Sequence, residues 1–498
     1  MNRTSGILLS ISSLPSPYGI GTLGRAAYEY ADFLCASGQS VWQMLPLGAT
    51  GYGDSPYQSV SSYAGNPYFI DLELLIEDGL LTQEEVSSRS WGAEPRLVDY
   101  GVLYENRFPV LYRAYRRGWE RDGGAVAQFR RENARWLEDY ALYMAVKRHF
   151  GMRSWQAWED EELRLRKSPA VLERYRRMLQ DEVQYFVYLQ FLFYRQWEAL
   201  RSYVHRLGIR IIGDLPIYVA MDSADVWAEP QFFQLDEAAM PTAVSGVPPD
   251  AFSQDGQLWG NPLYDWDAME KDGFGWWIRR VDGASRLYDS IRIDHFRGLD
   301  RYWSVPYGAA TAREGTWRQG PGRRLISVLN DWFPTVDFIA EDLGYPAESV
   351  VRLLQASGWP GMRVLEFAFD GGKPNSYQPH SYTENCICYT GTHDNSPLRL
   401  WWAETDEAVR RYAAAYLGLH AEEGVTWGFL RAGMGSVARL FVAQMQDYLE
   451  EPHRMNTPGT PSGNWRWRLL PEELRPELAQ RIRELTERYD RLPEAAKV

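Results

Sequence analysis

Residues 291–300 read IRIDHFRGLD, and this stretch decides the fold class of the chain. It begins like a buried β-strand and then places Arg292, Asp294 and His295 within four residues. Burying charge is costly unless the charge is paired or used, so the acid needs a partner and a purpose. Side chains alternate across a strand, which puts Arg292 and Asp294 on the same face. An apolar strand that ends in an acid is typical of parallel barrels, whose strand ends carry the active site.

Seven other short apolar runs resemble this one, and segments of helical length separate most of them. Strands rich in Ile, Val and Leu that alternate with helices indicate parallel βα units, and eight such strands close a (β/α)8 barrel. We therefore predict an α/β fold of the TIM-barrel type. The eight runs are GILLSI (6–11), VWQMLPLG (41–48), IRIIGDLPIYVA (209–220), YDSIRIDHFRG (288–298), VDFIAEDLG (336–344), MRVLEFAF (362–369), CICYTGTHDN (386–395) and VARLFVAQMQ (437–446).

Two long insertions interrupt the predicted barrel, which we expect to form a single catalytic unit over residues 1–498. Residues 73–208 are dense in Arg, Glu, Trp and Tyr with helical periodicity, which predicts a mostly helical subdomain with solvated outer faces. Residues 217–285 contain VSGVPPDAFSQDGQLWGNPLYDW (244–266), and its Pro, Gly and aromatic content predicts a long irregular segment with little helix. Long loops inside compact domains tend to be functional, so we expect an active-site loop there.

Composition excludes several classes of partner. The formal net charge is −13, which argues against nucleic-acid binding and against anchoring on an acidic membrane surface. The N-terminal residues lack a secretory signal, and the most apolar stretch, residues 185–194, is too short to span a bilayer. The three cysteines suit a reducing compartment, so we expect a cytoplasmic protein.

Two compositional features allow two interpretations each. Cys386 and Cys388 share one face of a predicted strand; small core side chains explain them better than a metal site, because no second cysteine pair or histidine cluster accompanies them. Aromatic residues make up 14 % of the chain, with 21 Trp and 31 Tyr. Most of these rings serve packing, but flat amphipathic rings also form platforms for sugar rings.

Three of the predicted strands end in acids, namely Asp294, Glu341 and Asp394. In a parallel barrel the C-terminal strand ends lie on one face, so these acids are expected to converge. For each acid taken alone, a cap of the following helix is the stronger explanation. The neighbours favour function: Arg292 would keep Asp294 ionised, and His295 and His393 lie beside two of the acids. Each histidine has the alternative of a satisfied core position.

A set of two or three carboxylates without a metal points to glycosyl transfer. One ionised acid attacks the anomeric carbon, and a second, protonated acid gives its proton to the departing oxygen. A retaining enzyme needs these groups about 5–5.5 Å apart, which neighbouring barrel strands supply. This chemistry requires no cofactor, and we expect none.

The motifs around these acids resemble those of one family. IRIDHFRG, IAEDLG and YTGTHDN are similar to the three core motifs of the 4-α-glucanotransferases (amylomaltases, or disproportionating enzymes), a branch of the α-amylase superfamily. The resemblance implies a barrel without the C-terminal β-sandwich of typical amylases. Further matches run in order along nearly the whole chain: GYGDSPYQSVSSYAGNPYFIDL (51–72), GDLPIYVAMDSADVW (213–227), PPDAFSQDGQLWGNPLYDW (248–266), GMRVLEFAF (361–369) and NTPGTPSGNWRWR (456–468).

The resemblance also implies a role for each matching residue. Asp294 corresponds to the nucleophile, Glu341 to the acid/base, and Asp394 to the acid that holds the transferred sugar and stabilises its transition state. Arg292 and His393 correspond to the charge partner of the nucleophile and to a hydrogen-bond donor to the same sugar, while His295 either lines the site or supports it. The other matching positions are an architectural acid, Asp214, and residues near the glucan chain, Tyr57, Gln257, Trp259, Phe367 and Asn464.

The implied reaction moves an α-1,4-glucan segment from a donor to the 4-OH of glucose or of another glucan, through a covalent glucosyl-enzyme. Expected partners are maltooligosaccharides, glucans derived from amylose, starch or glycogen, and glucose as acceptor. A hydrolase of the same superfamily and a non-catalytic α-glucan-binding protein are the alternatives. The chain departs from the family pattern at Ser396 and Pro397, where an acid and a threonine are expected, and at Met221, where a polar residue is expected.

Overall fold

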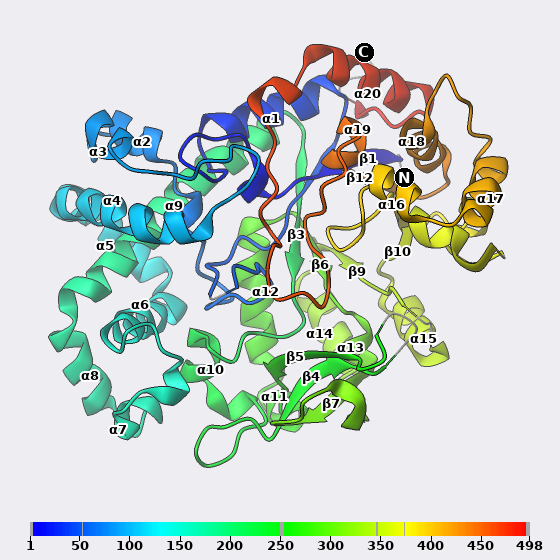
Figure 1. Ribbon diagram of the computed structural model, residues 1–498. Helices are drawn as coiled ribbons and strands as arrows, with labels where there is room; N and C mark the ends of the chain where they lie inside the picture. The colour runs from blue at the N-terminus through cyan, green and yellow to red at the C-terminus, as the bar shows by residue number, and fades with distance from the viewer. Residues whose placement is uncertain (1–2, 52, 250–252, 345–346, 373, 495–498) are drawn as a thin grey trace.

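The computed structural model describes residues 3–51, 53–249, 253–344, 347–372 and 374–494. Eight parallel strands form a closed barrel in the order β1-β12-β11-β10-β9-β6-β3-β2 (Figure 1). Each predicted apolar run overlaps one of these strands, so the (β/α)8 barrel is confirmed. The strands are β1 (Thr4–Leu8), β2 (Val41–Gln43), β3 (Arg210–Leu215), β6 (Ser290–Ile293), β9 (Asp337–Ala340), β10 (Gly361–Val364), β11 (Cys386–Tyr389) and β12 (Leu440–Gln444).

Helices surround this barrel, which explains why most of its strands read as continuous apolar runs. Strands covered on both faces bury alternate side chains in the barrel interior and under the helices. No strand follows β12 in the described part of the chain. The helices that follow the strands are α1 (Arg25–Ala36), α13 (Arg297–Asp300), α14 (Arg323–Trp332), α15 (Glu348–Ser357), α16 (Leu398–Glu404), α17 (Glu407–Leu417), α18 (Val425–Gly435), α19 (Met445–Leu449) and α20 (Pro476–Arg488).

Residues 73–208 contain helices that lie to one side of the barrel (Figure 1). The last of them, α9 (Gln180–Arg206), also packs against α1 of the barrel and leads directly into β3. Whether the segment folds as a separate subdomain stays a prediction. The other helices after β2 are α2 (Leu72–Glu77), α3 (Gln83–Ser87), α4 (Tyr100–Arg121), α5 (Gly123–Glu132), α6 (Ala134–His149), α7 (Glu161–Arg164) and α8 (Pro169–Met178).

Residues 217–285 are more regular than predicted, and the expectation of little helix there is wrong. The segment holds α10 (Ala224–Ala228), α11 (Trp266–Lys271) and α12 (Gly275–Leu287), the last of which leads into β6. Strands β4 (Ala243–Val247) and β5 (Gln257–Pro262) join β7 (Arg301–Pro306) and β8 (Thr316–Gln319) in a sheet ordered β5-β4-β7-β8. Because β4 pairs with β7, which lies beyond β6, the composition of residues 217–285 alone did not indicate this sheet.

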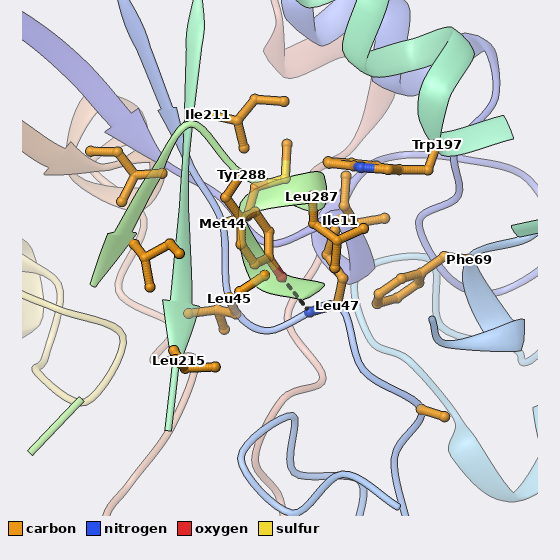
Figure 2. Packing of buried hydrophobic residues seen from close by; sticks show 14 of the residues in the cluster. Ile11, Met44, Leu45, Leu47, Phe69, Trp197, Ile211, Leu215, Leu287 and Tyr288 are labelled. Carbon is orange, nitrogen blue, oxygen red and sulfur yellow. Dashed lines mark hydrogen bonds between the residues drawn. The ribbon is translucent and has the colours of Figure 1, made fainter. Parts of the chain in front are cut away.

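One aromatic side chain ties the segments around β2, β3 and β6 together. Tyr288 lies among Met44, Leu45 and Leu287, and its hydroxyl accepts a hydrogen bond from the Leu47 main-chain N–H at 3.1 Å (Figure 2). Its ring occupies the space above Gly213 on β3, where an added Cβ would lie 2.1 Å from ring atoms. The absence of a side chain at Gly213 therefore allows the strand and this ring to lie close together.

None of the described helices combines the length and the apolar character needed to cross a membrane.

Candidate functional site

The three predicted acids leave the barrel at the C-terminal ends of β6, β9 and β11. Ile293 and Ala340 are register partners on neighbouring strands, so Asp294 and Glu341, the next residues, leave the barrel at the same level. Backbone hydrogen bonds continue past the strand ends, since the Glu341 N–H donates to the Ile293 carbonyl at 3.1 Å. Asp394 lies further along, in the turn that follows β11.

A single buried arginine connects two carboxylates at this end of the barrel. Nη1 of Arg292 donates to both carboxylate oxygens of Asp214, at 2.7 and 2.6 Å, and to Oδ1 of Asp294 at 2.8 Å. Asp214 is the register partner of Arg292 on β3. Burial disfavours the charged guanidinium, but Asp214 and Asp294 hold the pKa of Arg292 well above its usual value. The predicted pairing of Arg292 with Asp294 is present, and Asp214 fixes the position of the guanidinium through its two hydrogen bonds.

Tyr57 and His393 link this cluster to Asp394. The Tyr57 hydroxyl donates to Oδ2 of Asp214 at 2.6 Å and lies 3.3 Å from Nδ1 of His393. The two rings stack with centroids 5.0 Å apart, and Nε2 of His393 lies 3.4 Å from Oδ1 of Asp394. Burial raises the pKa of Tyr57 well above its usual value, so the phenol remains a hydrogen-bond donor.

Glu341 has a different environment from Asp294. Its carboxylate accepts two main-chain hydrogen bonds, from His295 N at 2.7 Å and from Leu343 N at 2.8 Å. Burial raises the pKa of Glu341 to about 7; Arg292 opposes this change and the negative charge of Asp294 adds to it. A carboxyl group with this pKa is populated in both protonation states near neutral pH, as a group that alternates between acid and base requires.

The main chain of His295, the residue after Asp294, contacts the carboxylate of Glu341. Its φ of 53° is left-handed, which is uncommon for a residue with a side chain, and its N–H points at Glu341. The ring meets Trp259 edge to face at a centroid distance of 4.8 Å, and burial lowers its pKa to about 4. Nε1 of Trp259 donates to Oε1 of Gln257 at 3.2 Å, so both residues of β5 lie beside the Asp294 turn. Phe252, which belongs to the stretch 244–266 where we expect the active-site loop, lies outside the described residues.

Two predicted site residues, Phe367 and Asn464, make no described hydrogen bond or ring contact with the three acids or with the site residues around them. Phe367 packs edge to face on Tyr377, with ring centroids 5.4 Å apart. The Asn464 side chain bonds within its own loop, accepting from Thr457 N at 2.9 Å and donating to the Thr460 carbonyl at 3.1 Å. Asn464 therefore shapes its loop in this structure.

The described residues contain no cluster of three His, Cys, Asp or Glu side chains able to hold a metal ion. Cys386 and Cys388 are buried as free thiols on β11, where they pack as small core residues.

The family model for 4-alpha-glucanotransferases matches residues 9–473. The chain belongs to this family. It is 45 % identical to a 4-alpha-glucanotransferase of Clostridium butyricum over 487 residues, covering 97 % of this chain and 100 % of the relative. It is 47 % identical over 503 residues to one of Thermus thermophilus, covering 98 % and 99 %. An amylomaltase from Streptococcus agalactiae, solved in complex with acarbose, superposes with a TM-score of 0.96 at 41 % identity and covers 99 % of this chain and 100 % of that one.

Membership in the 4-alpha-glucanotransferase family makes the protein an enzyme of this activity, with α-glucans as its substrates. The structure adds two residues that were not predicted from the sequence, a neighbour of Asp394 and a neighbour of His393. Nδ2 of Asn456 donates to Oδ1 of Asp394 at 2.6 Å, and the ring of Trp465 lies 5.8 Å from that of His393. Both belong to the motif NTPGTPSGNWRWR, so the signal was present, but the motif does not reveal which asparagine faces the acid.

Proposed function

We propose that this 4-alpha-glucanotransferase works by retaining double displacement, with Asp294 as nucleophile and Glu341 as general acid and base. One observation carries the proposal. Asp294 and Glu341 leave neighbouring strands at the same level, and one carboxylate is paired with a buried arginine while burial raises the pKa of the other to about 7. Of two neighbouring carboxyl groups, the one paired with a cation is suited to act as nucleophile, and the one with the raised pKa is suited to carry the proton.

In the first step, Asp294 attacks the anomeric carbon of an α-1,4-glucan donor. The bond between this carbon and the O4 of the next sugar breaks as Glu341 transfers its proton to that oxygen. The products are a β-linked glucosyl-enzyme and a departed glucan with a new 4-OH end. Glu341 is left ionised, ready to accept a proton.

In the second step, the 4-OH of an acceptor attacks the same carbon from the opposite face. Glu341 removes the hydroxyl proton, the bond to Asp294 breaks, and an α-1,4 linkage forms again. We propose maltooligosaccharides and glucans derived from amylose, starch or glycogen as donors, and glucose or a second glucan as acceptor. A cytoplasmic location fits the three free thiols of the chain.

The remaining site residues hold the transferred sugar or the acids. We assign Asp394 and His393 to hydroxyl groups of this sugar, where the negative charge of Asp394 stabilises the oxocarbenium-like transition state. Arg292 is the charge partner of Asp294, and Asp214 with Tyr57 fixes the position of that arginine. Trp259, Gln257, Phe367 and Asn464 are proposed to lie along the glucan chain, and His295 to support Glu341.

The products formed from maltotriose test the reaction. Transfer produces glucose and longer maltooligosaccharides with no net gain in reducing ends, whereas hydrolysis raises the number of reducing ends steadily. The variant Asp294→Asn should lose transfer by a factor on the order of 10³ or more, because an amide cannot form the glycosyl ester. Exposed Tyr307, outside the proposed site, offers Tyr307→Phe as a matched control. An active Asp294→Asn variant would remove Asp294 from the nucleophile role.

A further inference from the structure

The turn that carries His393 and Asp394 is held by a loop from a distant part of the chain, residues 454–456. The Asn456 main-chain N–H donates to the His393 carbonyl at 3.1 Å, while its side chain contacts the Asp394 carboxylate. Nη2 of Arg454 donates to the main-chain carbonyl of Asp394 at 2.6 Å. Hydrogen bonds from a charged donor are roughly twice as strong as neutral ones, so the cation fixes the backbone of the acid.

Two more contacts set the orientation of this guanidinium. Nε of Arg454 donates to the Asn456 carbonyl at 3.2 Å, and Nη1 donates to the Ser396 hydroxyl oxygen at 3.1 Å. That hydroxyl donates its own proton to Oε2 of Glu404 on α16, at 3.2 Å. A hydroxyl has one proton and two lone pairs, so Ser396 can serve both partners at once. Position 396 is also where the family resemblance predicts an acid.

We propose that Arg454 is a positioning residue for Asp394, oriented by the relay from Ser396 to Glu404. This inference rests on the role proposed above for Asp394 in stabilising the transition state. The planar guanidinium binds the Asp394 carbonyl and the Ser396 hydroxyl of the turn, and the Asn456 carbonyl of its own loop. Without it, the carbonyl of Asp394 loses its charged donor, and the backbone that presents the carboxylate to Asn456 and His393 is held less firmly. Small displacements of a group that acts on the transition state reduce turnover more than binding.

The kinetic test uses maltotriose disproportionation by the full-length enzyme. We expect Arg454→Ala to lower kcat on the order of 10- to 100-fold while KM changes less than about threefold. Arg454→Lys keeps the charge but not the fork of donors, and it should recover only part of the loss. Free guanidinium ion at millimolar concentration should partly restore Arg454→Ala. Ser396→Ala and Glu404→Gln should each cost about 2- to 10-fold, the range of one hydrogen bond.

Arg399 offers a matched control, because it also donates to a main-chain carbonyl, that of Glu450 at 2.9 Å, but from the exposed side of α16. Arg399→Ala should keep its kcat and gain nothing from guanidinium ion. Circular dichroism and the midpoint of thermal unfolding establish that each variant is folded. A general loss of structure in Arg454→Ala would not respond to added guanidinium ion.

A double-mutant cycle separates this inference from the proposed function. If Arg454 acts through Asp394, adding Arg454→Ala to Asp394→Asn should change the residual rate less than about twofold. An Arg454→Ala variant with wild-type kcat, next to an inactive Asp394→Asn variant, would overturn the positioning role and leave the function of Asp394 intact. A fully active Asp394→Asn variant would overturn the proposed function itself.

Discussion

At the scale of single residues, Asp294 and Glu341 occupy equivalent positions in the barrel but have different surroundings. Both follow the last residue of a strand, at the same level of neighbouring strands. Among the described residues, Asp294 receives a side-chain donor, from Arg292, whereas Glu341 is bound by two main-chain N–H groups. A difference in partners between two like groups is sufficient to give them different roles.

The raised pKa of Glu341 predicts how activity depends on pH. The first step needs the protonated acid, and this form declines as the pH rises through about 7. We therefore expect kcat/KM for maltotriose to fall about tenfold for each pH unit well above this value. A profile measured between pH 5 and pH 9 checks the prediction. An unchanged kcat/KM up to pH 9 would contradict the assignment of Glu341 as the acid.

At the scale of elements, the sequence reveals features that are local and misses those that depend on distant pairing. All eight barrel strands were predictable because buried parallel strands are continuous apolar runs, as in IRIIGDLP before α10. The four-stranded sheet was missed because β4, which pairs with the nearby β5, has its second partner in β7, which follows β6 in the chain. Asn456 was passed over for Asn464 for a similar reason, because its contact with Asp394 joins two turns that only the fold brings together.

The close approach of β3 to Tyr288 predicts a strong effect of one methyl group. Gly213→Ala would place a Cβ 2.1 Å from the Tyr288 ring, so either the ring or the strand must move. We expect the free energy of unfolding to fall by about 2 kcal/mol or more. Gly124→Ala is the control, because Gly124 lies in α5 with nothing within 4 Å of an added Cβ. Chemical denaturation compares the two variants, and equal stability would contradict this account of Gly213.

The segment before and within β5 gives a prediction about water. We propose that residues 252–259 act as a lid that shields the glycosyl-enzyme, because Trp259 already contacts His295 beside Asp294. Deletion of residues 252–259 should raise the ratio of hydrolysis to transfer several-fold, measured as reducing ends released per maltotriose consumed. The variant Tyr307→Phe, in the turn directly after β7 of the same small sheet, should keep the wild-type ratio. A deletion variant with an unchanged ratio would remove the lid from the mechanism.

At the scale of the whole molecule, the buried carboxyl group of Glu341 lowers the free energy of unfolding as the pH rises. Burial raises the pKa of Glu341 in the folded protein from its ordinary value of 4.5 to about 7. Between these pH values the folded state holds a proton that the unfolded chain releases, so stability falls as the pH rises through this window. Above about pH 7 the full cost is present, on the order of 3 kcal/mol.

The variant Glu341→Gln should remove this dependence because glutamine does not titrate. We take the difference in free energy of unfolding between this variant and the wild type. From pH 5 to pH 8 this difference should shift by about 2 kcal/mol in favour of the variant. Comparing the two pH values cancels the constant cost of the altered hydrogen bonds. Glu198→Gln, at an exposed position of α9, should show no such change. Parallel stability curves for Glu341→Gln and the wild type would contradict the raised pKa.

Helix α9 limits how far the protein can be trimmed. It packs against α4 and α6 at one side and against α1 at the other, and it buries Trp197 beside Phe69 and Leu287 (Figure 2). It is also the helix that connects to β3, so it takes part in both the barrel and the helical segment before it. A shortened enzyme for biotechnology would therefore have to retain α9 and give its uncovered face a new polar surface. The helical segment is inserted between β2 and β3 in the sequence, but the segment and the barrel both pack against α9.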